Sequence, residues 1–108
     1  LSETEYILPF QNENTKSSFH LYPIRVNFEK CKKNQKDIFD HLKKANIFAN
    51  LHYIPIYRQP FFEKLGFKEG YCPESEAFHR EAISIPVYPD LKREDQKKVI
   101  SALTDALV

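Results

Sequence analysis

Two stretches of the sequence, residues 35–46 and 92–107, repeat apolar residues every three or four positions. This spacing predicts two amphipathic helices, each with one apolar stripe and one charged face. The stripes consist of Ile38, Phe39, Leu42 and Ala45 in the first helix and of Val99, Ile100, Leu103 and Leu107 in the second. A helix with a single apolar stripe buries it against another element, so the fold requires a second layer.

Local signals mark the ends of these and two shorter helices. Asn34 precedes the first amphipathic stretch and has a side chain that favours the N-cap position. A short helix is predicted over residues 57–65, and Gly66 follows it where a left-handed residue commonly ends a helix. Another is predicted over residues 74–82, directly after Pro73.

Three segments have the composition of β-strands. They are residues 18–28, 50–56 and 83–86, which are rich in aromatic and β-branched side chains. Pro23 and Pro55 cannot donate ladder hydrogen bonds, so they favour edge positions or bulges for the first two segments. Strands alternating with helices predict an α/β layered fold, in which helices cover a small sheet of about three short strands.

The length and composition are those of one globular domain. The chain has 108 residues, of which 42% are hydrophobic and 29% are charged, and this balance excludes a disordered chain or a coiled coil. Residues 1–17 hold one short apolar group and a polar run, so they are predicted to form a linker or arm. The domain itself is expected over residues 18–108.

Charge and cysteine content exclude several classes of partner. The formal net charge is +1, which provides no general attraction to nucleic acid or to anionic lipid. No apolar run is long enough to span a membrane and no signal peptide is recognisable. Cys31 and Cys72 are far apart and lack metal-ligand spacing, so we expect free thiols in a soluble, cytoplasmic protein without a metal site.

The densest group of functional side chains lies at His52, Tyr53, Tyr57, Arg58 and Gln59. These donors suit a polar ligand such as a sugar, and an arginine suits a diphosphate. The sequence contains no recognisable catalytic motif, and its two glycines make a phosphate-binding loop improbable. We therefore predict binding residues here and no catalytic residue.

Structural explanations for the same histidines stay open. His52 and Tyr53 could simply alternate across a half-buried strand, one packed and one solvated. His20 and Tyr22 share one side of the first predicted strand, where they could face a cleft together, although a packed core histidine is the more common arrangement.

Several short motifs follow one another in an order that resembles a known family. They are FHLY at 19–22, ANI at 45–47, HYIP at 52–55, QP at 59–60, SIP at 84–86 and LKRED at 91–95. The same succession is typical of the C-terminal part of the DegT/DnrJ/EryC1/StrS family of sugar aminotransferases. The resemblance extends over residues 17–107.

This resemblance implies a fold, a cofactor and partners. The family consists of dimeric fold-type I enzymes, whose C-terminal small domain has a small, mostly antiparallel sheet covered by helices. Pyridoxal phosphate (PLP) and its Schiff-base lysine belong to the large domain, and no motif of that domain is present in this sequence. The resemblance therefore implies a C-terminal small domain that would bind no cofactor and be inactive alone. It would be separated from its N-terminal large domain, and the complete parent enzyme would be a homodimer.

The resemblance also implies a reaction and site residues. Residues 20–24 and 52–60 are most similar to one branch of the family. Enzymes of this branch transfer an amino group, with glutamate the expected donor, to C4 of a UDP-linked 4-keto-6-deoxy sugar towards pseudaminic acid. His52 and Tyr53 would face the sugar, and Arg58 would bind the diphosphate. The sequence departs from the family pattern at three positions. Tyr57 replaces a common histidine, Phe62 replaces a common tyrosine, and Lys92 replaces a threonine that caps the last helix.

Two other functions are compatible with the composition. The chain could be a stand-alone α/β module that binds a small molecule, or a non-catalytic dimerisation module. The first predicts that the chain alone binds a sugar nucleotide, and the second predicts association without a small ligand. Neither explains the ordered motifs.

Overall fold

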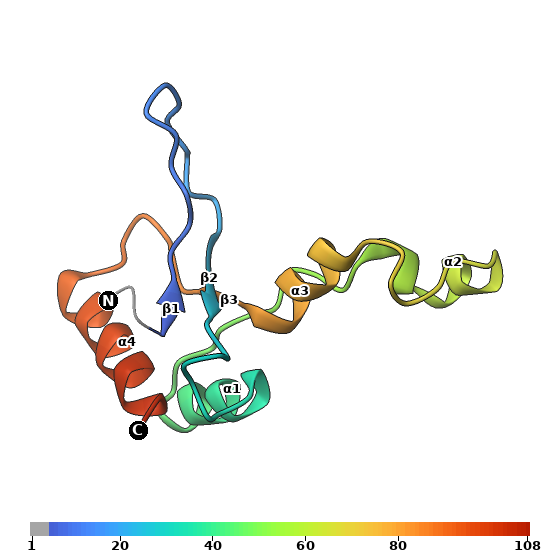
Figure 1. Ribbon diagram of the computed structural model, residues 1–108. Helices are drawn as coiled ribbons and strands as arrows, with labels where there is room; N and C mark the ends of the chain where they lie inside the picture. The colour runs from blue at the N-terminus through green and yellow to red at the C-terminus, as the bar shows by residue number, and fades with distance from the viewer. Residues whose placement is uncertain (1–4) are drawn as a thin grey trace.

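The computed structural model describes residues 5–108, which form a three-stranded antiparallel sheet and four α-helices (Figure 1). The elements in chain order are β1 (Tyr6–Ile7), β2 (Tyr22–Val26), α1 (Gln35–Lys44), the 3-10 helix η1 (Ile56–Arg58), α2 (Pro60–Lys64), α3 (Pro73–Glu81), β3 (Ala82–Ile85) and α4 (Arg93–Ala106). The sheet order is β1-β2-β3. The predicted small antiparallel sheet with helices is confirmed.

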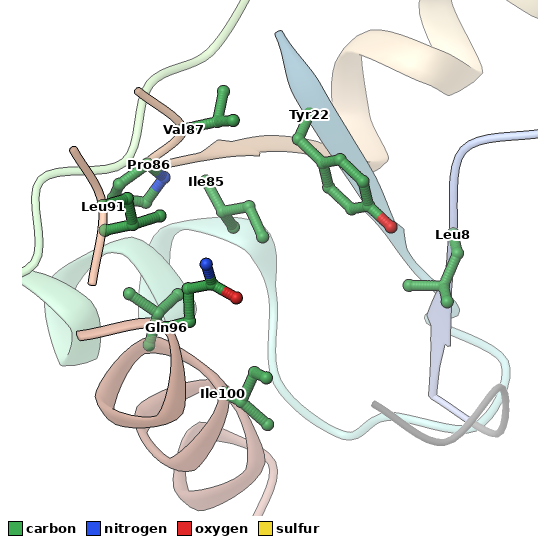
Figure 2. A pocket seen from close by; sticks show the side chains of 9 residues that line it. Leu8, Tyr22, Ile85, Pro86, Val87, Leu91, Gln96 and Ile100 are labelled. Atoms are coloured by element: carbon green, nitrogen blue, oxygen red, sulfur yellow. The ribbon is translucent and has the colours of Figure 1, made fainter. Parts of the chain in front are cut away.

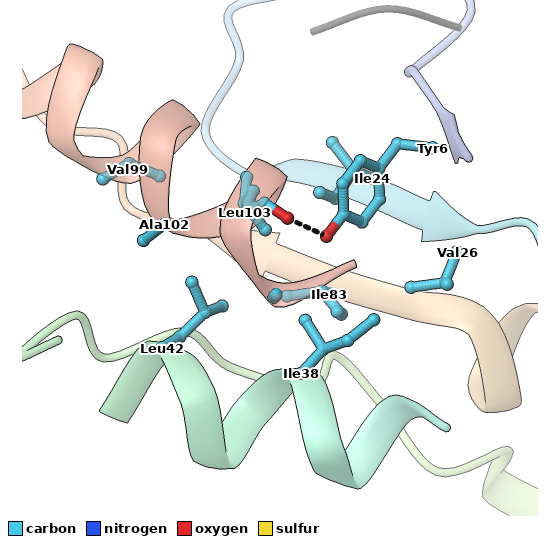
Figure 3. Close-up of a cluster of buried hydrophobic side chains, with 10 residues drawn as sticks. Tyr6, Ile24, Val26, Ile38, Leu42, Ile83, Val99, Ala102 and Leu103 are labelled. Atoms are coloured by element: carbon cyan, nitrogen blue, oxygen red, sulfur yellow. Dashed lines mark hydrogen bonds between the residues drawn. The ribbon is translucent and has the colours of Figure 1, made fainter. Parts of the chain in front are cut away.

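The two amphipathic helices pack against the sheet in a single core (Figure 3). Ile38 and Leu42 of α1 and Leu103 of α4 meet Ile24 of β2 and Ile83 of β3, and all five side chains are fully buried. Burial of such aliphatic side chains stabilises a fold by about 1.5–3 kcal/mol each. The single apolar stripe of each helix thus meets the layer that the sequence requires.

Helix α1 begins at the predicted N-cap. The side chain of Asn34 accepts a hydrogen bond from the backbone N–H of Asp37 at 2.9 Å, and the Asn34 N–H donates to Asp37 Oδ2 at 3.1 Å. This reciprocal capping box satisfies two backbone donors that a helix N-terminus otherwise leaves without partners.

The strand that carries Pro23 is central, so the predicted edge position is wrong. Pro23 lies opposite Ser84 of β3, whose backbone N–H and C=O pair with Asn50 on the other side. On the side of β1, the ladder ends at the pair of Ile7 and Arg25. Neither neighbouring strand therefore requires a donor from Pro23, which explains how a central strand accommodates a proline.

The strand predicted over residues 50–56 is also wrong. Asn50 forms one bridge with Ser84, and the chain then leaves the sheet. Tyr53 and Ile56 are 71% and 67% exposed, so the apolar composition of this segment does not reflect burial in a strand. Pro55 directly precedes η1 and ends the extended segment.

The third strand comes instead from the segment predicted to be a linker or arm. β1 pairs antiparallel with β2, and Tyr6 is only 2% exposed within the core. Its hydroxyl donates a hydrogen bond of 2.7 Å to the carbonyl of Leu103, and burial raises the pKa of Tyr6. Leu103 lies in the last turn of α4, where carbonyls lack partners within the helix. Tyr6 thus joins β1 to the end of α4.

Residues 56–81, which we call the lateral lobe, project away from the sheet (Figure 1). The radius of gyration is 15.4 Å, against about 13 Å for a compact chain of this length. The predicted helix over 57–65 is divided into η1 and α2, and Gly66 follows α2 at φ 102° as expected. A chain of edge-to-face ring contacts stiffens the lobe, joining Tyr57, Tyr71, Phe67, Phe62 and Phe61 in succession.

Candidate functional site

An open cleft of about 380 Å³ lies where the chain passes from the sheet into the lateral lobe. Its walls come from the 50–56 segment and from the first turns of α3. The lining residues are His52, Tyr53, Pro55, Glu74, Ser75 and Phe78. The structure therefore brings together two of the three predicted binding residues, His52 and Tyr53.

His52 is half-buried and contacts strand β3 of the sheet. Its Nδ1 lies 3.0 Å from the hydroxyl oxygen of Ser84, which is 5% exposed on β3. The ring of Tyr53 meets the His52 ring edge to face, with centroids 4.6 Å apart and an interplanar angle of 70°. Because Tyr53 is 71% exposed, its phenol is available to a ligand in the cleft.

Arg58 does not line this cleft. It borders a smaller cavity of about 150 Å³, which shares Pro55 with the cleft. Its Nε donates to Glu63 at 3.2 Å, and its guanidinium lies 3.8 Å from Glu69. The hydrogen bond to Glu63 is the main cause of a raised pKa of Arg58. Arg58 thus has two carboxylate partners and borders a different cavity from the one that His52 and Tyr53 line.

Four residues of the site escaped sequence reasoning. Glu74, Ser75 and Phe78 line the cleft from α3, and Ser84 supports His52 from β3. Glu74 and Phe78 are four positions apart, which places them on one helix face, but nothing in the sequence ties that face to His52. Ser84 belongs to the SIP motif at 84–86, which is the sequence signal that could have identified it.

A buried polar network connects separate segments within the lateral lobe. Tyr57 donates to the carboxylate of Glu76 and accepts from the N–H of Cys72 at 3.2 Å, while the N–H of Gly70 donates to Glu76 at 2.7 Å. The hydrogen bonds from Tyr57 and Gly70 lower the pKa of Glu76, and loss of solvation raises that of Tyr57. Tyr57, which stands where the family commonly has a histidine, therefore donates a hydrogen bond to a carboxylate.

Acidification is expected to open the lateral lobe before the core. A carboxylate with a lowered folded-state pKa stabilises the fold fully above its ordinary pKa of about 4.3, and this contribution is lost as the pH falls through the lowered value. We therefore expect hydrogen exchange at Gly70, corrected for intrinsic rates, to accelerate in acid relative to exchange at Ile83. In Glu76→Gln, the amide oxygen accepts hydrogen bonds without titrating, so this difference should be small. An unchanged acid response in Glu76→Gln would show that another group controls the opening.

A second cavity, of about 350 Å³, lies between the sheet and α4 (Figure 2). Its lining is mainly apolar and includes Leu8, Tyr22, Ile85 and Ile100, with Gln96 at its border. It shares no lining residue with the His52 cleft. It offers few polar groups to a sugar.

Other sequence expectations can be located within residues 5–108. His20 is exposed and precedes β2, so the arrangement of a packed core histidine is wrong. Cys31 and Cys72 are free thiols, as expected. The described part of the chain contains no cluster of three or more histidine, cysteine or acidic residues that could hold a metal ion. None of its helices is long and apolar enough to cross a membrane.

Known proteins that resemble this chain include longer transaminases that act on nucleotide sugars. A UDP-4-amino-4,6-dideoxy-N-acetyl-beta-L-altrosamine transaminase of Helicobacter pylori is 36% identical over 86 residues, which cover 78% of this chain and 22% of that protein. The chain spans about a quarter of the length of the curated relatives that it matches.

Solved structures of aminotransferases contain a part with the same fold as this chain. Helicobacter pylori PseC, an aminotransferase involved in the biosynthesis of pseudaminic acid, superposes with a TM-score of 0.73 at 33% identity, over 85% of this chain and 24% of that one. The PLP form of Spr1654 from Streptococcus pneumoniae, assigned as a sugar aminotransferase, has a TM-score of 0.79 at 26% identity, over 96% of this chain and 28% of that one. The family model for these enzymes matches residues 1–104, so the chain belongs to the DegT/DnrJ/EryC1/StrS aminotransferase family.

Proposed function

We propose that this chain is the C-terminal small domain of a PLP-dependent nucleotide-sugar aminotransferase. The observation that carries the proposal is the family match over residues 1–104 together with the cleft at His52 and Tyr53. Residues 18–108 make up the small domain. Residues 1–17 lead in from the large domain, and Tyr6–Ile7 of this segment completes the sheet.

The His52 cleft forms one wall of the sugar site. A sugar presents hydroxyl groups together with apolar C–H faces, and the cleft has matching groups for both. The imidazole of His52 and the phenol of Tyr53 hydrogen-bond hydroxyl or carbonyl oxygens, while the Phe78 ring packs against the sugar ring. The carboxylate of Glu74 accepts from hydroxyl groups and repels phosphate, which favours the sugar over the diphosphate at this position.

Arg58 is the proposed ligand of the diphosphate, next to the sugar cleft. Its ion pairs with Glu63 and Glu69 are partly exposed, and ion pairs of this kind contribute little to stability. The guanidinium can therefore exchange one carboxylate for a phosphate oxygen when the nucleotide sugar binds. Pro55 borders both cavities, so the proposed diphosphate position is adjacent to the sugar cleft.

The described residues do not fit the cofactor. No lysine lines the His52 cleft, and all the lysines of residues 5–108 other than the half-buried Lys33 are exposed. We therefore assign PLP and its lysine to the large domain, where the cofactor supplies the electron-accepting ring for amino transfer. This chain contributes binding and orientation of the sugar, and we propose that it has no transaminase activity alone.

The proposed substrate is a UDP-linked 4-keto-6-deoxy sugar, aminated at C4 in a pathway of the pseudaminic-acid type. The names of the Helicobacter pylori transaminase and of PseC support this choice. Glutamate is the proposed amino donor. We further propose a cytoplasmic homodimer as the complete enzyme, with which the free thiols of Cys31 and Cys72 are compatible.

The proposal predicts that this chain acts only together with a large domain. Co-expression with the large domain of its enzyme should yield a complex that co-purifies, absorbs as bound PLP and aminates the UDP-linked keto sugar. The chain expressed alone serves as the control and should lack activity. Absence of a complex, combined with tight binding of a UDP-sugar to the chain alone, would establish the stand-alone binding module instead.

A further inference from the structure

Ser84 is the buried residue that meets His52 from beneath the cleft. Its hydroxyl oxygen lies 3.0 Å from Nδ1 of His52, and the residue is 5% exposed. It does not line the cleft itself. Any effect of Ser84 on a ligand is therefore exerted through His52.

The sheet fixes the position of this hydroxyl. The N–H of Ser84 donates to the carbonyl of Asn50 at 2.8 Å, and the N–H of Asn50 donates to the carbonyl of Ser84 at 3.0 Å. On the other side, Ser84 lies opposite Pro23 of the central strand. Both flanks of Ser84 are thus occupied by backbone, and Asn50 is two residues from His52.

The hydrogen-bonding requirements of the pair select one tautomer of the imidazole. A neutral imidazole has one N–H donor and one acceptor nitrogen, and a hydroxyl must donate its proton somewhere when it is buried. Within residues 5–108, the structure gives the Ser84 hydroxyl one partner, which is Nδ1 of His52. If Nδ1 carried the proton, the Ser84 O–H would lack an acceptor. The hydroxyl therefore donates to Nδ1, and the proton of the neutral ring is on Nε2.

We propose that Ser84 is a positioning residue that makes His52 an Nε2–H donor towards the cleft. The ligand atom opposite Nε2 is then an acceptor oxygen of a carbonyl or hydroxyl group. This second part rests on the proposed function, because it takes the cleft to bind a keto sugar. The first part, which concerns the tautomer, does not depend on any ligand.

The tautomer can be read directly by ¹⁵N NMR of the histidine side chains in this chain, at a pH where His52 is neutral. We expect Nδ1 of His52 to be unprotonated and Nε2 protonated, with the Ser84→Ala variant showing a mixture of both tautomers. Ser101→Ala, an exposed serine on α4, is the control and should match the parent. A parent spectrum with Nδ1 protonated would overturn the proposal even if Ser84→Ala did not fold.

The ligand part is tested separately in the complete enzyme. Ser84→Ala should raise KM for the keto sugar roughly tenfold, the equivalent of about one hydrogen bond, and leave KM for the amino donor unchanged. Ser84→Thr retains the hydroxyl and should restore most of the affinity. If the NMR result holds but KM for the sugar does not change, the tautomer assignment stands and the sugar assignment of the cleft fails.

Discussion

Replacing Tyr6 with alanine is expected to lower the free energy of unfolding by about 4 kcal/mol. The change removes a ring that is 2% exposed in the core and a hydrogen bond of 2.7 Å to Leu103. It also leaves the Leu103 carbonyl without this partner at the end of α4. Denaturant titration followed by circular dichroism measures the difference, which is a large part of the 5–15 kcal/mol of a typical domain.

Two further variants separate the ring from its hydroxyl and from the segment as a whole. Tyr6→Phe retains the packing and should cost only about 1–2 kcal/mol. Phe10→Ala changes an aromatic residue of the same segment that is 90% exposed, and it should alter stability by less than about 0.5 kcal/mol. Equal stabilities of Tyr6→Ala and Phe10→Ala would mean that β1 does not belong to the folded core.

His52→Ala in the complete enzyme is expected to reduce kcat/KM for the keto sugar roughly 100-fold, as at a central binding residue. The substitution removes the proposed donor to the sugar and the ring that packs against Tyr53. Steady-state kinetics with varied keto sugar measures the loss. Tyr53→Phe removes only a hydroxyl group and should have a smaller effect.

The reaction with the amino donor provides the internal control for this prediction. In the proposed reaction, the amino-donor half is independent of the keto sugar, so its rate with glutamate should be the same in His52→Ala and in the parent. Unchanged kinetics for the keto sugar in both His52→Ala and Tyr53→Phe would remove the His52 cleft from the sugar site. A loss of the amino-donor reaction would point instead to a general structural defect.

The helices were predictable because their signals are local. The stripe of α1, its cap at Asn34 and the glycine after α2 each depend on residues within a few positions of one another. Strand β1 was not predictable in this way. Tyr6 pairs with Val26 and bonds to Leu103, and no pattern within residues 1–17 identifies these distant partners.

The errors at the prolines have a common physical origin. Whether a strand tolerates proline depends on the hydrogen-bonding side of that residue, which is a property of the register. Pro23 lies where β1 has ended and where Ser84 pairs with Asn50, whereas Pro55 lies beyond a single bridge. Composition cannot distinguish the two cases, so both predicted strands needed correction.

The candidate site was predictable only in part for a similar reason. His52 and Tyr53 are adjacent in the chain and stand in a recognisable motif, so a pattern could select them. Glu74 and Phe78 reach the cleft because α3 folds back along the 50–56 segment. Arg58 follows the HYIP motif by three residues, yet it lies in the turn η1 and borders a different cavity.

The hydrogen bond between Tyr6 and Leu103 has a consequence for how the protein emerges from the ribosome. The two residues are 97 positions apart, so the core cannot close until α4 has left the exit tunnel. Synthesis proceeds at about 5–20 residues per second. Until α4 is available, the apolar side chains of β1 and β2 that pack against it remain exposed. A premature stop codon before position 103 would leave a nascent chain without its final layer and exposed to proteolysis.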